Sequence, residues 1–118
     1  MVVNMHPTTA DDLYKFSAAV PGLKIVWAHL KSYDMYEEQL EMMRRHENVF
    51  FDISAFTTDK DGAIRHSIDM VGSERLLFGT DYPGVNPAGD IAAVLAERLS
   101  YAELENTFHK NAERLLDL

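Results

Sequence analysis

Four short apolar runs, each followed by a segment with helical spacing, constrain the fold of this chain more than any other feature. The runs are VVNMH from Val2, KIVWAHL from Lys24, NVFFDIS from Asn48 and RLLFGTD from Arg75. Each has the length and composition of a buried strand, and they begin roughly 22 to 27 residues apart. Strands that alternate with helices form parallel sheets joined by right-handed crossovers. The sequence therefore predicts an α/β fold of four β-α units.

Helix-capping patterns support this organisation. Thr9 with Asp12 resembles a capping box, and Ser100 with Glu103 forms a second one that opens a pair of short helices near the end of the sequence. Strands are predicted near residues 2–6, 24–29, 48–54 and 75–80, in sequential order, and helices over about 9–20, 34–45, 61–71 and 90–99. Because no linker or low-complexity tract divides the sequence, we expect residues 1–118 to form one domain.

Alternation along a strand predicts which side chains share a face of the sheet. One predicted face carries mostly polar residues at the carboxyl ends of the strands: Asn4, His6, Trp27, His29, Asp52, Ser54, Gly79 and Asp81. The opposite face is apolar and suits packing under helices: Val3, Val26, Ala28, Val49, Phe51, Ile53, Leu76 and Phe78. Ligand sites of open α/β sheets and β/α barrels lie at the carboxyl ends of strands. The polar set therefore predicts a site there.

His6, His29 and Asp81 are the candidate functional residues. Imidazoles and a carboxylate at one sheet edge suit a metal site or general acid-base catalysis. Each residue also has a structural reading: Asp81 as the cap of a turn, His29 as a buried hydrogen-bonded histidine and His6 as a loop histidine. Asp52 is interpreted as a hydrogen-bonding partner. His46, His66 and His109 are expected on the surface.

Composition argues against several classes of partner and location. The formal net charge of −8 argues against nucleic acid, because phosphate binding requires clustered Lys and Arg. No apolar run approaches the ~20 residues that span a bilayer, and the first residues lack the pattern of a signal peptide. The sequence contains no cysteine. We therefore expect a cytoplasmic protein without disulfides, in which His, Asp or Glu would hold any metal.

Four segments resemble a known family in their order and spacing. PGLKIVWAHL, NVFFDISAF, GSERLLFGTDYP and NAERLLDL are similar to the carboxy-terminal half of a metal-dependent amidohydrolase, of the branch that includes aminocarboxymuconate-semialdehyde decarboxylase. The resemblance implies half of a TIM barrel, with our four strands matching strands five to eight. It also implies a divalent metal, zinc, bound by His6 and Asp81. Asp81 would activate water, and His29 would contact substrate or move protons.

Two functions follow from this resemblance. The first is a metal-dependent hydrolase or carboxy-lyase that acts on a small carboxylated or cyclic substrate. The family's first-strand His-x-His pair, which supplies two metal ligands, is absent from these 118 residues, and catalytic zinc sites usually have three protein ligands. The second function is therefore a catalytically inactive half-barrel that serves as an assembly or binding module.

Open strand edges lead us to expect a homo-oligomer. Four barrel strands leave two edges unpaired and one face uncovered, and we expect Trp27, Val2 and Ile25 on that face. A second copy in a two-fold homodimer would cover the face or complete an eight-stranded pseudo-barrel. In the closed version, Asn4-x-His6 of the second copy would take the place of the missing His-x-His pair.

Overall fold

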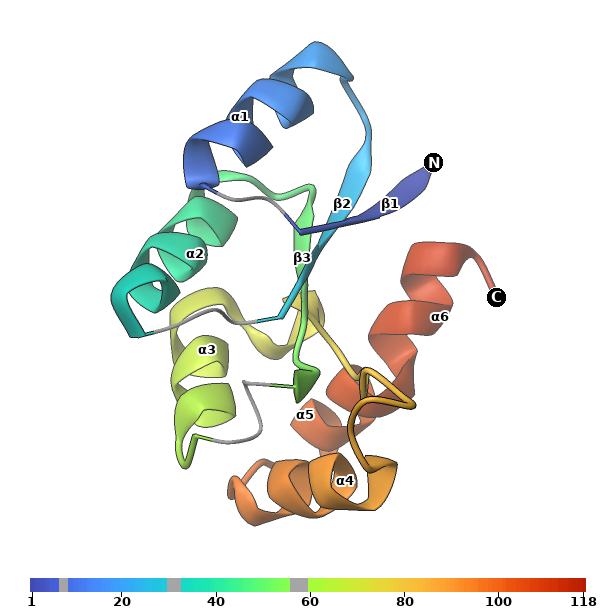
Figure 1. The fold of residues 1–118 in the computed structure, drawn as a ribbon. Coiled ribbons are helices and arrows are strands. Elements are labelled where there is room, and N and C mark those ends of the chain that lie inside the picture. Colours follow the sequence, from blue (N-terminus) through green and yellow to red (C-terminus); the bar gives the residue numbers. More distant parts are fainter. Residues whose placement is uncertain (7–8, 30–32, 56–59) are drawn as a thin grey trace.

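A single parallel sheet forms the centre of the protein (Figure 1). The computed structural model describes residues 1–6, 9–29, 33–55 and 60–118, with side chains omitted for residues 33–35. The strands are β1 (Val2–Met5), β2 (Lys24–Ala28), β3 (Val49–Asp52) and β4 (Leu76–Leu77). They pair in parallel in the order β1-β2-β3-β4. The predicted strand order and direction are confirmed, although the strands end earlier than expected.

Helices follow each strand, as predicted. They are α1 (Ala10–Ala19), α2 (Tyr33–Arg45), α3 (Ala63–Val71), α4 (Pro87–Ala96), α5 (Tyr101–Glu105) and α6 (Asn111–Leu116). A 3-10 turn, η2 (Ser73–Arg75), precedes β4, and a π-helical segment, η3 (Asn106–Lys110), joins α5 to α6. Thr9 caps α1 by accepting from the Asp12 amide, and the capping box of Ser100 and Glu103 is complete. Among the described residues, no helix is both long and apolar enough to cross a membrane.

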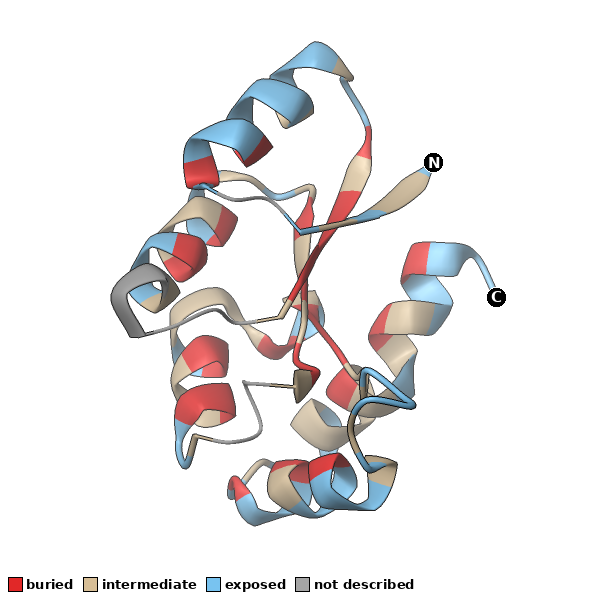
Figure 2. Cartoon of the chain, in the orientation of Figure 1, coloured by how far each residue is buried: buried red, intermediate tan, exposed pale blue. Residues whose placement is uncertain are grey.

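The main hydrophobic core lies between the sheet and helices α1, α2 and α3, which cover one face (Figure 1). Buried residues follow the sheet and the inward sides of these helices (Figure 2). The helices contribute Leu13, Leu40, Met43, Ile64 and Ile68, and the strands contribute Ile25, Trp27, Val49, Phe51 and Leu76. Fully burying a large apolar side chain contributes about 1.5–3 kcal/mol, so this layer supplies most of the driving force for folding.

The predicted faces of β2 are reversed in the structure. Trp27 is 1% exposed and packs in the helix-side core, whereas Val26 lies beside Asn4 on the opposite face. The sequence prediction placed Trp27 on the same face as His29 because the two residues lie two positions apart. That residue has a φ of 61°, in the left-handed region, so the chain turns at the end of β2 and His29 does not continue the alternation. The residues of β1, β3 and β4 lie on the faces predicted for them.

The other face of the sheet is covered by α6, which lies across from α1–α3 (Figure 1). Leu115 of α6 is buried with Val26 and Leu77, and Val2 and Phe50 pack around them, together with Ala112. Ile25 and Trp27 are therefore not on an exposed face, contrary to the expectation from the sequence. Helix α6 therefore covers part of the apolar surface that was expected to need a second copy, at Val26 and Leu77, whereas Val2 stays half-buried.

The carboxy-terminal helices also anchor β4. The Phe78 amide donates to the Thr107 carbonyl in η3 (3.0 Å). The buried Asn111 side chain donates to the carbonyls of Ser73 and Leu76, at 2.6 and 2.7 Å. These bonds give β4 neighbours on its outer edge, so among the described strands only β1 ends the sheet with an open edge. They also hold the strand that leads to Asp81.

Candidate active site

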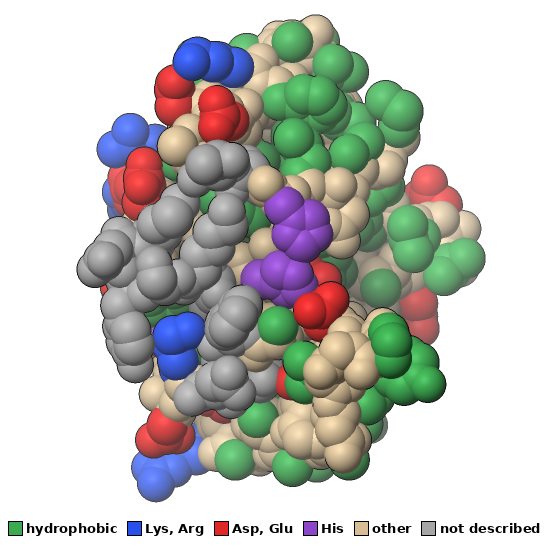
Figure 3. Space-filling model, viewed as in Figure 1, with side chains coloured by type: hydrophobic (Ala, Val, Ile, Leu, Met, Phe, Trp, Pro, Cys, Tyr) green, Lys and Arg blue, Asp and Glu red, His purple; other side chains and the backbone are tan. Residues whose placement is uncertain are grey.

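His6 and His29 meet at the carboxyl ends of β1 and β2. His6 directly follows β1 and His29 directly follows β2, and their ring centroids are 4.9 Å apart. Because the two strands are parallel neighbours, the first residues beyond them lie at the same sheet edge. Figure 3 shows histidine side chains in contact on this face of the molecule, with an acidic side chain beside them. The pairing of these two predicted residues is therefore present in the structure.

Ser54 and Asp52 fix the position of His29. The Ser54 hydroxyl forms a 2.8 Å hydrogen bond with His29 Nδ1, and the Ser54 amide donates to Asp52 Oδ1 at 2.8 Å. Ser54 is 1% exposed, so this arrangement is shielded from competing water. Asp52 is thus a hydrogen-bonding residue, as interpreted from the sequence. With Nδ1 engaged, Nε2 is the His29 nitrogen left to act on another group.

Asp81 lies on an exposed turn beyond β4 with a φ of 55°. Its carbonyl accepts from the Gly84 amide at 2.9 Å, and a cis peptide bond joins Tyr82 to Pro83. Non-glycine residues with positive φ cost about 1–3 kcal/mol and concentrate at functional sites. His29 shares this conformation, and so do Ala55, Arg98 and Asp117 among the described residues, so it does not by itself mark the site.

Gly79 is required by the packing of Asp52, a relationship that sequence analysis missed. A Cβ atom at position 79 would stand 2.9 Å from Asp52 Cγ and closer still to Oδ1. The carboxylate therefore lies directly against the backbone of the strand that leads to Asp81. The sequence signal for this contact is the glycine itself, which interrupts an otherwise bulky apolar strand.

The described residues do not form a complete metal site. No group of three or more His, Cys, Asp or Glu side chains is placed to hold a metal ion within residues 1–6, 9–29, 33–55 and 60–118. His6 and Asp81 have the donor chemistry that a divalent metal uses, but catalytic sites usually have three protein ligands. Their assignment as metal ligands, and that of zinc as the metal, stays a prediction.

The other three histidines lie away from this edge and make surface contacts. His66 Nε2 pairs with Glu37 Oε1 across α3 and α2, and His109 Nδ1 pairs with Glu113 Oε1 within the last helical run, both at 2.9 Å. The His46 ring packs edge-on against Tyr14. These contacts agree with the surface positions expected for all three.

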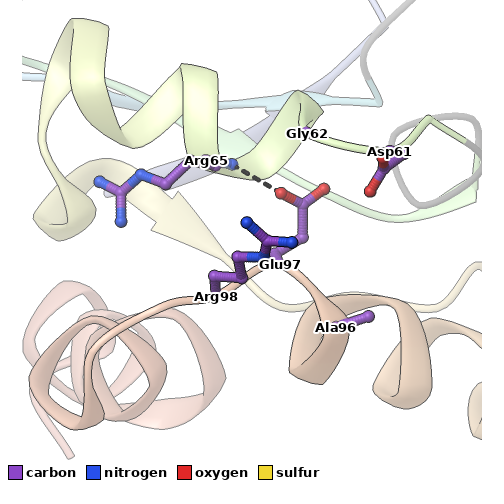
Figure 4. A pocket seen from close by; sticks show the side chains of 6 residues that line it. All are labelled: Asp61, Gly62, Arg65, Ala96, Glu97 and Arg98. Carbon is purple, nitrogen blue, oxygen red and sulfur yellow. Dashed lines mark hydrogen bonds between the residues drawn. The ribbon is translucent and has the colours of Figure 1, made fainter.

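Two surface pockets lie outside the histidine pair. One, of about 350 Å³, is lined by Asp61, Gly62, Arg65, Ala96, Glu97 and Arg98 (Figure 4). Its buried Glu97 carboxylate accepts from the Ile64 and Arg65 amides at the start of α3, so it already caps that helix. The other, of about 640 Å³, lies between α1 and α2. Neither pocket is lined by His6, His29 or Asp81. The candidate catalytic and metal-binding side chains therefore lie outside both pockets, beyond the carboxyl ends of the strands.

A comparison with known protein families identifies the family of this chain. Residues 1–118 match the family described as amidohydrolase. The chain belongs to the amidohydrolase family. The sequence has no significant match among curated proteins.

Solved structures with the same fold include several decarboxylases. One is 2,6-dihydroxybenzoate decarboxylase in complex with 2,6-dihydroxybenzoate, with a TM-score of 0.76 and 17% identity over 100% of this amidohydrolase chain and 51% of that one. A dihydroxybenzoic acid decarboxylase from Polaromonas, with bound manganese and the inhibitor 2-nitroresorcinol, has a TM-score of 0.69 and 22% identity, covering 92% and 39% of the two chains. The 5-carboxyvanillate decarboxylase from Sphingomonas paucimobilis has a TM-score of 0.69 and 20% identity, covering 87% of this chain and 36% of that one.

The chain spans about half the length, or less, of these structural neighbours. Its four β-α units thus correspond to about half of a TIM-barrel amidohydrolase, as the resemblance in the sequence implied. In such barrels the active site lies at the carboxyl ends of the strands. His6 and His29 meet at these carboxyl ends, directly after β1 and β2.

Proposed function

We propose that this chain provides half of a metal-dependent amidohydrolase site that decarboxylates or hydrolyses a small carboxylated aromatic or cyclic substrate. The observation that carries the proposal is the contact between His6 and His29, with His29 held by Ser54. The neighbours crystallised with 2,6-dihydroxybenzoate and 2-nitroresorcinol support the substrate class. The manganese in the Polaromonas enzyme supports a divalent metal rather than zinc in particular.

His29 is the proton carrier in this proposal. Decarboxylation of an aromatic acid requires a proton at the ring carbon that loses CO₂, and hydrolysis requires a proton on the leaving group. Because Ser54 engages Nδ1, Nε2 of His29 is the atom that gives or takes this proton. The hydrogen bond from the Ser54 amide to Asp52 Oδ1 holds the Ser54 backbone in place. His6 and Asp81 are the proposed metal ligands.

A second function, a half-barrel without catalysis, is favoured by one observation. The described residues include no group of three metal-ligating side chains, so these residues alone lack a complete centre for metal-assisted chemistry. In this case the histidine pair would serve a binding or assembly surface. Site-specific metal binding and turnover together separate the two functions.

The test is a titration of the ¹⁵N-labelled chain with MnCl₂, in which NMR monitors the resonances of the histidine rings at each Mn²⁺ concentration. Paramagnetic Mn²⁺ broadens nearby resonances, so we expect those of His6 and His29 to broaden before those of His66 and His109. Asp81→Asn should weaken apparent Mn²⁺ affinity by about tenfold while leaving the fold intact. ZnCl₂ added afterwards should restore sharp lines if zinc takes the same site.

Turnover is then measured as CO₂ release from 2,6-dihydroxybenzoate in the presence of MnCl₂. Selective broadening with turnover that Asp81→Asn abolishes supports the enzyme. Selective broadening without turnover supports the binding module. Equal broadening of all five histidines, or none at saturating Mn²⁺, contradicts a metal site at this edge.

A further inference from the structure

Gln39 is a polar side chain at a core-facing position of α2. It is 2% exposed and lies on the same side of the helix as the half-buried Tyr36 and the buried Leu40 and Met43, at the spacing i, i+3, i+4 and i+7. An apolar residue usually occupies such a position, because a buried carboxamide costs free energy unless its polar atoms have hydrogen-bond partners. What Gln39 contacts therefore indicates why a glutamine stands here.

The Gln39 side chain reaches the turn at the end of β2. Its Nε2 donates to the backbone carbonyl of His29 at 3.3 Å. The strand ends at Ala28, so this carbonyl lies directly beyond the last register pair between β2 and β3. Gln39 thus provides a hydrogen bond to the backbone at the point where the strand ends.

The backbone of His29 is in the left-handed region, with a φ of 61°. A non-glycine residue in this region carries strain that the surrounding contacts have to offset. Ser54, which follows β3, holds the imidazole at Nδ1, and Gln39 on α2 holds the carbonyl. The ring and the backbone of His29 are therefore held by two different parts of the fold.

We propose that Gln39 is a positioning residue of the candidate site: its hydrogen bond to the His29 carbonyl maintains the left-handed turn that directs the imidazole toward Ser54 and His6. The Ser54 hydroxyl fixes only the ring nitrogen. A backbone that left this turn would carry the ring away from His6, whose ring centroid is 4.9 Å away. The effect of Gln39 on catalysis rests on the proposed function, whereas its effect on the geometry of His29 does not.

NMR of the isotopically labelled chain without metal tests this role. Gln39→Met fills the core position with a side chain of similar length that donates no hydrogen bond. Loss of one neutral hydrogen bond changes a conformational equilibrium by about 2- to 10-fold, so we expect the left-handed turn to lose population by that factor relative to other backbone conformations. The cross-peak between the His29 amide and Hα protons, which lie close together at positive φ, should weaken. The cross-peak between the His6 and His29 rings should weaken with it.

Leu40→Met is the matched control. Leu40 is the next residue on α2 and is 0% exposed, so this substitution also changes buried packing but removes no hydrogen bond. We expect both cross-peaks to keep their wild-type intensity. Wild-type intensities in Gln39→Met overturn the proposal, and so do equal losses in Leu40→Met, because the geometry of His29 would then depend on packing in general.

Ser54→Ala separates the two contacts that hold His29. It frees the ring and leaves the Gln39 hydrogen bond, so the cross-peak between the rings should weaken while the amide-Hα cross-peak stays strong. The signals of His66 and His109, which lie away from the site, report whether each variant is folded. If both Gln39→Met and Gln39→Leu lose these native signals, Gln39 supports the whole fold and the proposal is wrong.

Turnover separates failure of this proposal from failure of the proposed function. If the wild-type chain releases CO₂ from 2,6-dihydroxybenzoate with MnCl₂, Gln39→Met should lower kcat by about 2- to 10-fold with little change in KM, because it displaces the proton carrier rather than a substrate contact. An unchanged kcat in a variant that has lost both cross-peaks contradicts a positioning role. If the wild-type chain has no turnover, the proposed function fails, and the two cross-peaks still decide whether Gln39 positions His29.

Discussion

At the scale of single residues, the candidate site depends on backbone conformations that side-chain patterns do not encode. His29 and Asp81 both have positive φ values, of 61° and 55°. At His29 this conformation directs the ring toward Ser54 and His6 rather than along the alternation of β2. Gly79 completes the arrangement because the Asp52 carboxylate occupies the space where a Cβ would lie.

Replacing Gly79 tests whether this close approach is needed. Gly79→Ala should destabilise the protein by about 1–3 kcal/mol, because the added methyl displaces the Asp52 carboxylate from its bond with the Ser54 amide. Urea unfolding measures the change. Gly89→Ala is the matched control: a methyl group added there would meet no atom within 4 Å, and an alanine inside α4 should stabilise it by about 0.5–1 kcal/mol. Equal effects at both glycines would contradict the packing argument.

At the scale of elements, charged side chains join helices that are distant in the sequence. Arg65 on α3 donates to both carboxylate oxygens of Glu103 on α5, each at 2.9 Å, and also to Asp69 on its own helix. The Arg65 hydrogen bonds, with that from the Ser100 amide, lower the pKa of Glu103 from its ordinary value of 4.5 to about 2. The folded protein thus favours the ionised form of this carboxyl group.

This pKa shift predicts a pH dependence for the α3-α5 link. A lowered folded-state pKa contributes stability that is present above the ordinary value of 4.5 and is lost as the pH falls toward about 2. Arg65→Gln should therefore cost about 1 kcal/mol near neutral pH, and less as the pH falls through this window. Urea unfolding at several pH values measures the difference. Lys15→Gln removes a fully exposed pair with Asp11 and should change nothing measurable; a constant cost for Arg65→Gln at every pH would refute the link.

At the scale of the whole molecule, α6 covers the inner face of the sheet. In parallel sheets both faces are normally buried, and this sheet corresponds to about half of a barrel. Leu115 packs against Val26 and Leu77 on that face and is 5% exposed. Helices α1–α3 thus lie on one side of the sheet and α6 on the other, where it buries Val26 of β2 and Leu77 of β4 and leaves Asn4 of β1 exposed.

Leu115 and Leu116 are adjacent on α6 but only Leu115 is buried, so a substitution at each position tests whether α6 covers the inner face of the sheet. Leu115→Ala should cost about 2–4 kcal/mol of unfolding free energy, because it removes buried methyl groups and leaves a cavity over the inner face. It should also increase the binding of a hydrophobic dye such as ANS. Leu116→Ala, at a side chain that is 53% exposed, should change stability by less than about 0.5 kcal/mol. Similar losses in the two variants would show that α6 does not cover the sheet through Leu115.

The sequence by itself determined the α/β class, the four parallel strands, their order and the capped starts of helices. These features depend on apolar runs, helical spacing and capping pairs, such as Ser100 with Glu103, whose members lie within a few residues of each other. The polar strand ends also showed that His6 and His29 belong to one sheet edge. Short-range patterns therefore carried the architecture and the candidate histidine pair.

Tertiary structure alone decided which face of β2 carries Trp27, what covers the inner face of the sheet and why position 79 is glycine. Each depends on a contact between distant segments: Leu115 with Val26, or Asp52 with Gly79. The left-handed turn at His29 has only a weak marker in residue type, because histidine is enriched at positive φ but still adopts it in a small minority of cases. Alternation predicts a face only while the strand continues, and β2 ends before His29.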